Sequence, residues 1–87
     1  MDFNVRGDSD TKLLYIDASA DKIGIGTSGP ARALEINHGA GRNLRLTYND
    51  PNGDASNYAD FSMSSSGDLT IAPSGGDTNI TGNLAVS

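Results

Sequence analysis

Cysteine is absent from this chain of 87 residues. Without cysteine the protein cannot form disulfides or thiolate metal sites, and its redox compartment stays undetermined. Aromatic residues make up only 6% of the sequence, and no uninterrupted run of apolar residues approaches the length of a membrane span. A membrane-spanning helix needs about 20 apolar residues in succession. These absences exclude a disulfide-stapled fold and a transmembrane helix.

Basic residues are also scarce. Lys and Arg number 6 against 11 acidic residues, which gives a formal net charge of −5. A net negative charge disfavours binding to nucleic acid or to an anionic membrane surface, because both carry negative charge themselves. The first six residues, Met-Asp-Phe-Asn-Val-Arg, lack the basic and apolar regions of a signal peptide. We therefore expect no nucleic-acid partner and no membrane insertion. Because Met1 directly precedes an expected strand, we interpret the sequence either as a segment of a longer protein or as one with an artificial start.

Large apolar residues are few for the length of the chain. Leu, Ile, Val and Phe together account for 17 of the 87 residues. This fraction lies near the level at which a chain stops being able to build its own core. The length suits one small domain. We therefore expect a single module over residues 1–87 that needs a partner, a metal ion or further copies of itself to fold.

The sequence does contain short runs in which apolar and polar residues alternate, separated by Gly, Asn, Asp and Ser. This pattern predicts β-strands. The expected strands cover residues 3–5, 12–17, 22–25, 34–36, 44–48, 60–63, 69–71, 79–80 and 84–86. Residues 16–23 and 63–69 each have the strand–polar turn–strand pattern of a β-hairpin. One helical turn is expected at most, over residues 30–33, because proline suits the first position of a helix.

The sequence 24–29, Gly-Ile-Gly-Thr-Ser-Gly, matches the G-x-G-x-x-G pattern of dinucleotide-binding loops. Such a loop must open a long helix within a βαβ unit. Here Pro30 follows at once and a new strand is expected from Leu34. We therefore assign these glycines to turns and close packing, and expect no cofactor and no nucleotide binding.

Other candidate sites are weak. Asp50, Asn52 and Asp54 space oxygen atoms as a calcium loop does, but Phe61 stands where the closing Glu belongs, so a solvated loop is the preferred interpretation. Residues 6–8, Arg-Gly-Asp, match an adhesion tripeptide and equally suit a turn. His38 is the single histidine, and no Ser lies in a nucleophile elbow. We expect no catalytic residue and no enzyme activity.

Two blocks of the sequence resemble fibre proteins. Residues 21–36, Asp-Lys-Ile-Gly-Ile-Gly-Thr-Ser-Gly-Pro-Ala-Arg-Ala-Leu-Glu-Ile, resemble the (V/I)-G-I-G-T-x-x-P-x-x-x-L-x-V element of bacteriophage tail fibres and related bacterial fibres. Residues 65–87 resemble a second element of the same shafts, and residues 13–17 and 44–48 fit the segments between them. One departure is Gly29, where the pattern usually has Ser or Thr. No part of the chain resembles the self-cleaving chaperone domain that often follows such elements.

This resemblance implies a fold and a function. The fold is an intertwined or side-by-side homotrimeric β-fibre, of the β-prism or triple-β-helix kind, with a first β element over residues 1–36 and a second, containing a hairpin, over residues 37–87. Each chain then supplies a stripe of aliphatic side chains to a shared axis. The positions expected in this oligomer core are Ile23, Ile25, Leu34, Ile36, Leu44, Leu46, Leu69 and Ile71.

The implied function is structural: a shaft or spacer for host attachment in a virion tail fibre or on an extracellular surface, joined to neighbouring fibre segments. Two alternatives stay open. The chain is a carbohydrate- or cell-surface-binding module, with a host glycan held near the polar loops 37–43 and 49–57 by Tyr48 or Tyr58. Alternatively, it is a self-assembling filament subunit. A hydrolase is disfavoured because no carboxylate pair or Ser–His arrangement stands out.

Overall fold

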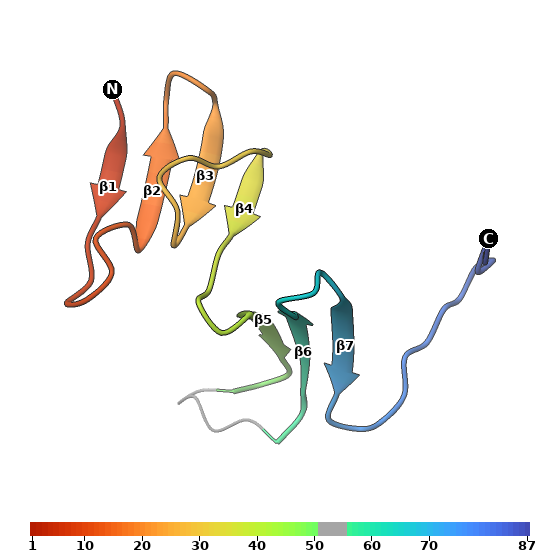
Figure 1. The fold of residues 1–87 in the computed structure, drawn as a ribbon. Coiled ribbons are helices and arrows are strands. Elements are labelled where there is room, and N and C mark those ends of the chain that lie inside the picture. The colour runs from red at the N-terminus through yellow and green to blue at the C-terminus, as the bar shows by residue number, and fades with distance from the viewer. Residues whose placement is uncertain (51–55) are drawn as a thin grey trace.

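The computed structural model describes residues 1–50 and 56–87. It is all-β: seven strands form two separate sheets, and the described ranges contain no helix (Figure 1). No helix that could cross a membrane is found in these ranges either. The expectation of an all-β chain is therefore confirmed. Residues 31–33 are bends, so the optional helical turn does not form.

Sheet A contains the first four strands in chain order: β1 (Phe3–Val5), β2 (Leu14–Asp17), β3 (Lys22–Ile25) and β4 (Leu34–Ile36). β1 pairs with β2 and β2 pairs with β3 in antiparallel fashion, whereas β3 and β4 are parallel. Both edges, β1 and β4, are only three residues long. Short edges limit uncontrolled pairing with other chains.

Sheet B is an antiparallel meander of β5 (Arg42–Thr47), β6 (Tyr58–Met63) and β7 (Leu69–Pro73). The β5–β6 register shifts between Arg42 and Leu44, as at a β-bulge. β5 and β7 form the two edges of this sheet. Extensive contacts within the described chain join neighbouring strands of one sheet and do not join the two sheets.

The two expected hairpins are confirmed, and polar side chains shape their loops. Between β2 and β3, the Asp17 carboxylate accepts hydrogen bonds from the backbone N–H groups of Ser19 and Ala20, both at 3.1 Å. Between β6 and β7, the Ser64 hydroxyl oxygen accepts from the N–H groups of Ser66 and Asp68. Such local side-chain bonds favour turns over continued strands.

The parallel pair β3–β4 is joined by a crossover over residues 26–33. Its path is set by Gly24, because a Cβ at this position would collide with the carbonyl oxygen of Thr27. The crossover therefore passes over the face of sheet A to which a side chain at position 24 would point. Gly24 in β3 and Pro30 in the crossover are both buried. The opposite face of sheet A is left uncovered.

A five-residue linker, residues 37–41, connects the two sheets, and hydrogen bonds order it. The Nδ1 atom of His38 accepts from the N–H groups of Ala40 and Arg42, at 3.2 and 3.1 Å. The side-chain amide of Asn43 donates to the carbonyl oxygen of Ile36 at 2.8 Å. Gly41 has φ +76°, and a Cβ there would collide with the carbonyl oxygen of Met63. The lone histidine thus has a role in the linker.

The C-terminal segment, residues 78–87, corrects one expectation. Strands were expected at residues 79–80 and 84–86, but the whole segment is free of regular structure and each of its residues is exposed. After β7 the chain turns, with the Gly76 N–H donating to the Pro73 carbonyl at 3.1 Å, and then runs away from sheet B (Figure 1). A strand needs a hydrogen-bonded neighbour, and this segment lies beside none in the single chain.

The described residues contain no buried large apolar side chain. The chain exposes 6972 Å², whereas a compact folded monomer of this mass exposes about 4,900 Å². Its radius of gyration is 15.7 Å, against about 12 Å for a compact domain of this length. The single chain therefore has well-formed sheets but no core of its own.

Candidate oligomerisation surface

One face of sheet A is entirely apolar. The register aligns Phe3, Ile16, Ile23 and Leu34 in a row across all four strands. A second row consists of Val5, Leu14, Ile25 and Ile36, each two positions from a residue of the first row. Because side chains alternate along a strand, this row points to the same side. The apolar face of sheet A comprises Phe3, Val5, Leu14, Ile16, Ile23, Ile25, Leu34 and Ile36.

This face is exposed although its side chains are large. Phe3 is 55% exposed and Leu34 is 54% exposed, and the others lie between half-buried and exposed. The crossover over residues 26–33 cannot cover them, because it lies over the opposite face at Gly24. Large contiguous apolar surfaces are typical of interaction sites, so this face is a candidate for one.

The opposite face of sheet A is polar. Its central row contains Asn4, Tyr15, Gly24 and Glu35. The Tyr15 hydroxyl donates to the Asp2 carboxylate at 2.7 Å. This hydrogen bond lowers the pKa of Asp2, helped by the Ala18 N–H, and raises the pKa of Tyr15. The polar face therefore suits contact with water, and the sheet has two chemically distinct sides.

Sheet B repeats this arrangement. Leu44, Phe61 and Ile71 align across its three strands, and Met63 lies opposite Leu69. Leu46, Ala59 and Pro73 form the next row on the same side. The apolar face of sheet B is made up of Leu44, Leu46, Ala59, Phe61, Met63, Leu69, Ile71 and Pro73. Leu69 is 61% exposed and Leu46 is 56% exposed, so this face also lacks a cover.

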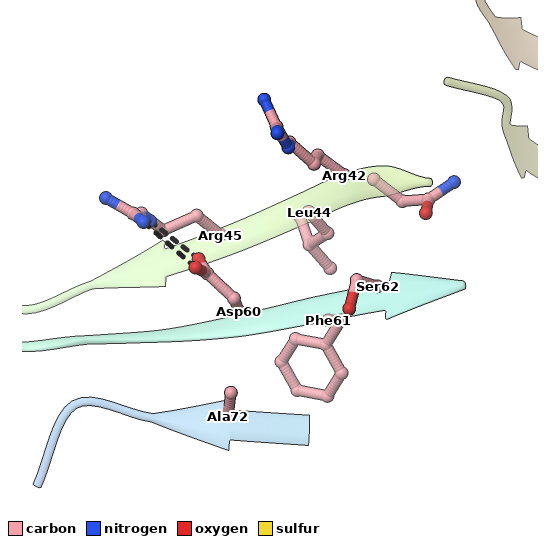
Figure 2. A pocket seen from close by; sticks show the side chains of 8 residues that line it. Arg42, Leu44, Arg45, Asp60, Phe61, Ser62 and Ala72 are labelled. Carbon is pink, nitrogen blue, oxygen red and sulfur yellow. Dashed lines mark hydrogen bonds and ion pairs between the residues drawn. The ribbon is translucent and has the colours of Figure 1, made fainter. Parts of the chain in front are cut away.

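The other face of sheet B carries an ion pair that joins β5 and β6. The Arg45 guanidinium donates to both carboxylate oxygens of Asp60, at 2.6 and 2.9 Å (Figure 2). Its carbon Cζ also lies 3.8 Å from the ring centre of Tyr58. These two hydrogen bonds, donated by Arg45, lower the pKa of Asp60 and raise the pKa of Arg45. This cluster crosses the β5–β6 pair on the face opposite the apolar one.

A hollow of about 580 Å³ lies along sheet B and is lined by residues of all three strands, among them Leu44, Phe61 and Ala72 (Figure 2). Its one carboxylate, Asp60, is engaged by Arg45. Its described lining contains no histidine and no second carboxylate. The hollow therefore offers no acid–base pair for catalysis.

The eight positions expected in the oligomer core fall on the two apolar faces. Ile23 pairs with Leu34 and Ile25 with Ile36 in sheet A. The other four, Leu44, Leu46, Leu69 and Ile71, belong to sheet B. They form two surfaces in place of the single stripe that was expected. The structure adds positions that the sequence interpretation omitted, namely Phe3, Val5, Leu14, Ile16, Phe61 and Met63.

Among the described residues, the remaining candidates are not brought together into a site. Asn52 and Asp54 of the calcium hypothesis lie outside the described residues. In the described ranges no group of three His, Cys, Asp or Glu residues is placed to hold a metal. Arg6-Gly7-Asp8 lies in a turn, where the Gly7 N–H donates to the Asp10 carbonyl at 2.7 Å.

The two tyrosines considered for sugar binding differ in environment. Tyr58 is half-buried, and Arg45 stacks on its ring. A sugar that stacked on this ring face would first have to displace the guanidinium. Tyr48 is 77% exposed and directly follows β5. The carbohydrate-binding hypothesis therefore depends on Tyr48 more than on Tyr58.

Comparison of the chain with family models, with curated proteins and with solved structures finds no match. The geometry of the two sheets is therefore the ground on which a function has to be argued.

Proposed function

We propose that the chain is a non-enzymatic structural segment of a trimeric fibre, similar to those of bacteriophage tails, and that it acts as a shaft or spacer in host attachment. The observation that carries this proposal is the pair of uncovered apolar faces on sheets A and B. Each face consists of regularly paired strands, and further copies of the chain are the cover that we propose.

The amount of exposed surface supports assembly. The chain exposes roughly 2,000 Å² more than a compact monomer of its mass. An ordinary protein–protein interface takes about 800 Å² from each partner, and obligate oligomers take more. The surplus is therefore large enough for contacts with two neighbours, as each chain of a trimer has.

The two-sided chemistry of the sheets supports a shared axis. Three chains can turn the apolar faces inward and leave the polar faces, including the Arg45–Asp60 pair and the Asp2–Tyr15 pair, in water. The resemblance of residues 21–36 to fibre elements supports the same number of chains.

The test is sedimentation equilibrium combined with circular dichroism over a hundredfold dilution. An obligate oligomer has no stable folded monomer, so its melting temperature rises with protein concentration. We expect a mass of three chains, and unfolding that accompanies dissociation. A folded monomer with a concentration-independent melt would overturn the proposal, and a stable dimer would overturn the trimer.

A further inference from the structure

The C-terminal segment, residues 78–87, has the pattern of a strand without a partner. Ile80, Leu84 and Val86 occupy alternate positions together with Gly82. The polar residues Asn79, Thr81 and Asn83 occupy the positions between them. An extended chain would therefore place the three large apolar side chains on one side and the polar ones on the other. All three are exposed, Val86 by 87%.

The backbone of this segment is unpaired too. No residue after Gly76 in the described chain takes part in a backbone hydrogen bond to the rest of the chain. Sheet B meanwhile has an open edge at β5, where only the β6 side is paired. An unpaired strand and an open edge are the two halves of a β-augmentation contact, in which main-chain hydrogen bonds join two chains.

We propose that residues 79–86 of one copy pair as a strand with the β5 edge of sheet B in a second copy of this chain. The proposal rests on the assembly proposed above and names the segment that joins neighbouring copies. The β5 edge fits better than the alternatives. β1 and β4 are three residues long, whereas β5 has six, and β7 contains Pro73, which has no N–H to donate.

The positions of the C-terminal segment and the β5 edge favour a contact between two copies over one within a single chain. The segment leaves sheet B from the β7 side, and β5 is the opposite edge of the same sheet (Figure 1). A segment leaving one edge of each copy can therefore meet the free edge of the next, and such head-to-tail contacts form a ring when the rotation closes. Ring closure would pair the β5 edge of every copy.

Strand direction is compatible with this contact. β7 and β5 run in the same direction, because each is antiparallel to β6. After β7 the chain turns near Gly76, and the following segment runs in the same direction as β6, away from the sheet (Figure 1). Copies related by rotation about an axis along the strands keep their strand directions. The segment would therefore meet the next copy's β5 as an antiparallel neighbour, and continue the meander.

The first test is amide hydrogen exchange on the full chain, followed by nuclear magnetic resonance with a mixture of isotope-labelled and unlabelled copies. We expect protected amides within residues 79–86 in the assembled protein, and inter-chain contacts between this segment and residues 42–47. An assembled trimer with unprotected amides in 79–86, or with contacts to another edge, would overturn the inference and leave the proposed function standing. A folded monomer would overturn both.

A matched pair of variants gives an independent test. Gly82→Pro/Asn83→Pro removes two successive N–H groups, so at least one ladder hydrogen bond is lost whichever residue faces the neighbour. Gly82→Ala/Asn83→Ala keeps both N–H groups, and nothing lies within 4 Å of a Cβ at position 82. We expect the proline variant to need at least about tenfold more protein for half-assembly, and the alanine variant to assemble as the parent does. Equal assembly of both variants would overturn the inference.

Discussion

Single residues decide how the chain passes over sheet A. Gly24 lies in the middle of a strand, where glycine ordinarily weakens structure. Its value here is the space it leaves for the Thr27 carbonyl as the crossover passes. The same motif contains Gly29, where an added Cβ meets nothing within 4 Å. Within this one sequence pattern, the fold therefore requires glycine at position 24 for steric reasons but not at position 29.

We expect Gly24→Ala to destabilise the folded assembly by about 1–3 kcal/mol, since the new Cβ collides with backbone and the crossover must shift. Thermal unfolding followed by circular dichroism measures this. Gly29→Ala is the control, with an expected change below about 0.5 kcal/mol. Equal effects at the two positions would contradict the packing described at Gly24.

The Arg45–Asp60 pair gives a pH dependence with a definite sign. An unfolded aspartate has a pKa of about 3.9, and hydrogen bonds from Arg45 lower the pKa of Asp60 in the folded chain. The pair therefore contributes its full stability above about pH 4, and that contribution is lost as the pH falls through the lowered pKa. Because both side chains are partly exposed, salt should weaken the effect.

The measurement is the melting temperature from pH 2 to pH 7 for the parent and for Asp60→Asn, at low and at high salt. We expect the parent to lose more stability than the variant on acidification, with a smaller difference at high salt. Identical acid profiles would show that the pair makes no contribution to folding.

At the scale of elements, alternation in the sequence predicted the seven strands and both hairpins. It did so because period-2 patterning reports which side chains share a face. Beyond the two hairpins, it could not report which strands are neighbours. The parallel pairing of β3 with β4, and the division into two sheets, depend on the crossover and on the linker at Gly41, whose steric demands involve residues distant in sequence.

The candidate surface was predictable in part for the same reason. The eight expected positions are apolar residues of alternating runs, and all lie on an apolar face. The pattern alone did not identify Phe3, Val5 and Ile16, whose place on that face follows from the register of β1, β2 and β3. Their assignment as an oligomer core stays a prediction.

Two neighbours on β7 test whether the faces differ in function. Leu69 lies on the apolar face opposite Met63, and Thr70 lies on the other side opposite Ser62. We expect Leu69→Asp to abolish assembly and folding, because a trimer would bring several unpaired carboxylates into an apolar interface. Thr70→Asp puts the same charge on the polar side and should change the melting temperature little.

Sedimentation velocity and circular dichroism of both variants, at one concentration, make this comparison. Assembly of the Leu69→Asp variant as tightly as the Thr70→Asp variant would show that the apolar face of sheet B stays in water. Ile25→Asp is the corresponding change on sheet A, and we expect the same loss.

At the scale of the whole molecule, closure determines the size of the particle. A ring of three copies satisfies its own contacts and stops growing, whereas head-to-tail contacts that fail to close continue into threads. We expect electron microscopy of the purified chain to show short particles of uniform length. Long unbranched threads at micromolar concentration would instead support the filament hypothesis.

In the fibre segment proposed above, the parallel pairing of β3 with β4 determines how sheet A responds when the fibre is pulled along its length. Because β2 and β3 each reverse direction and β4 does not, β1 and β4 point the same way. The chain thus enters sheet A at one end of its strands and leaves at the other (Figure 1). Force applied through these two points loads the strands in shear, so that neighbouring hydrogen bonds share the strain. An antiparallel β4 would have brought the exit to the same end as the entrance, and the sheet would peel open one bond at a time.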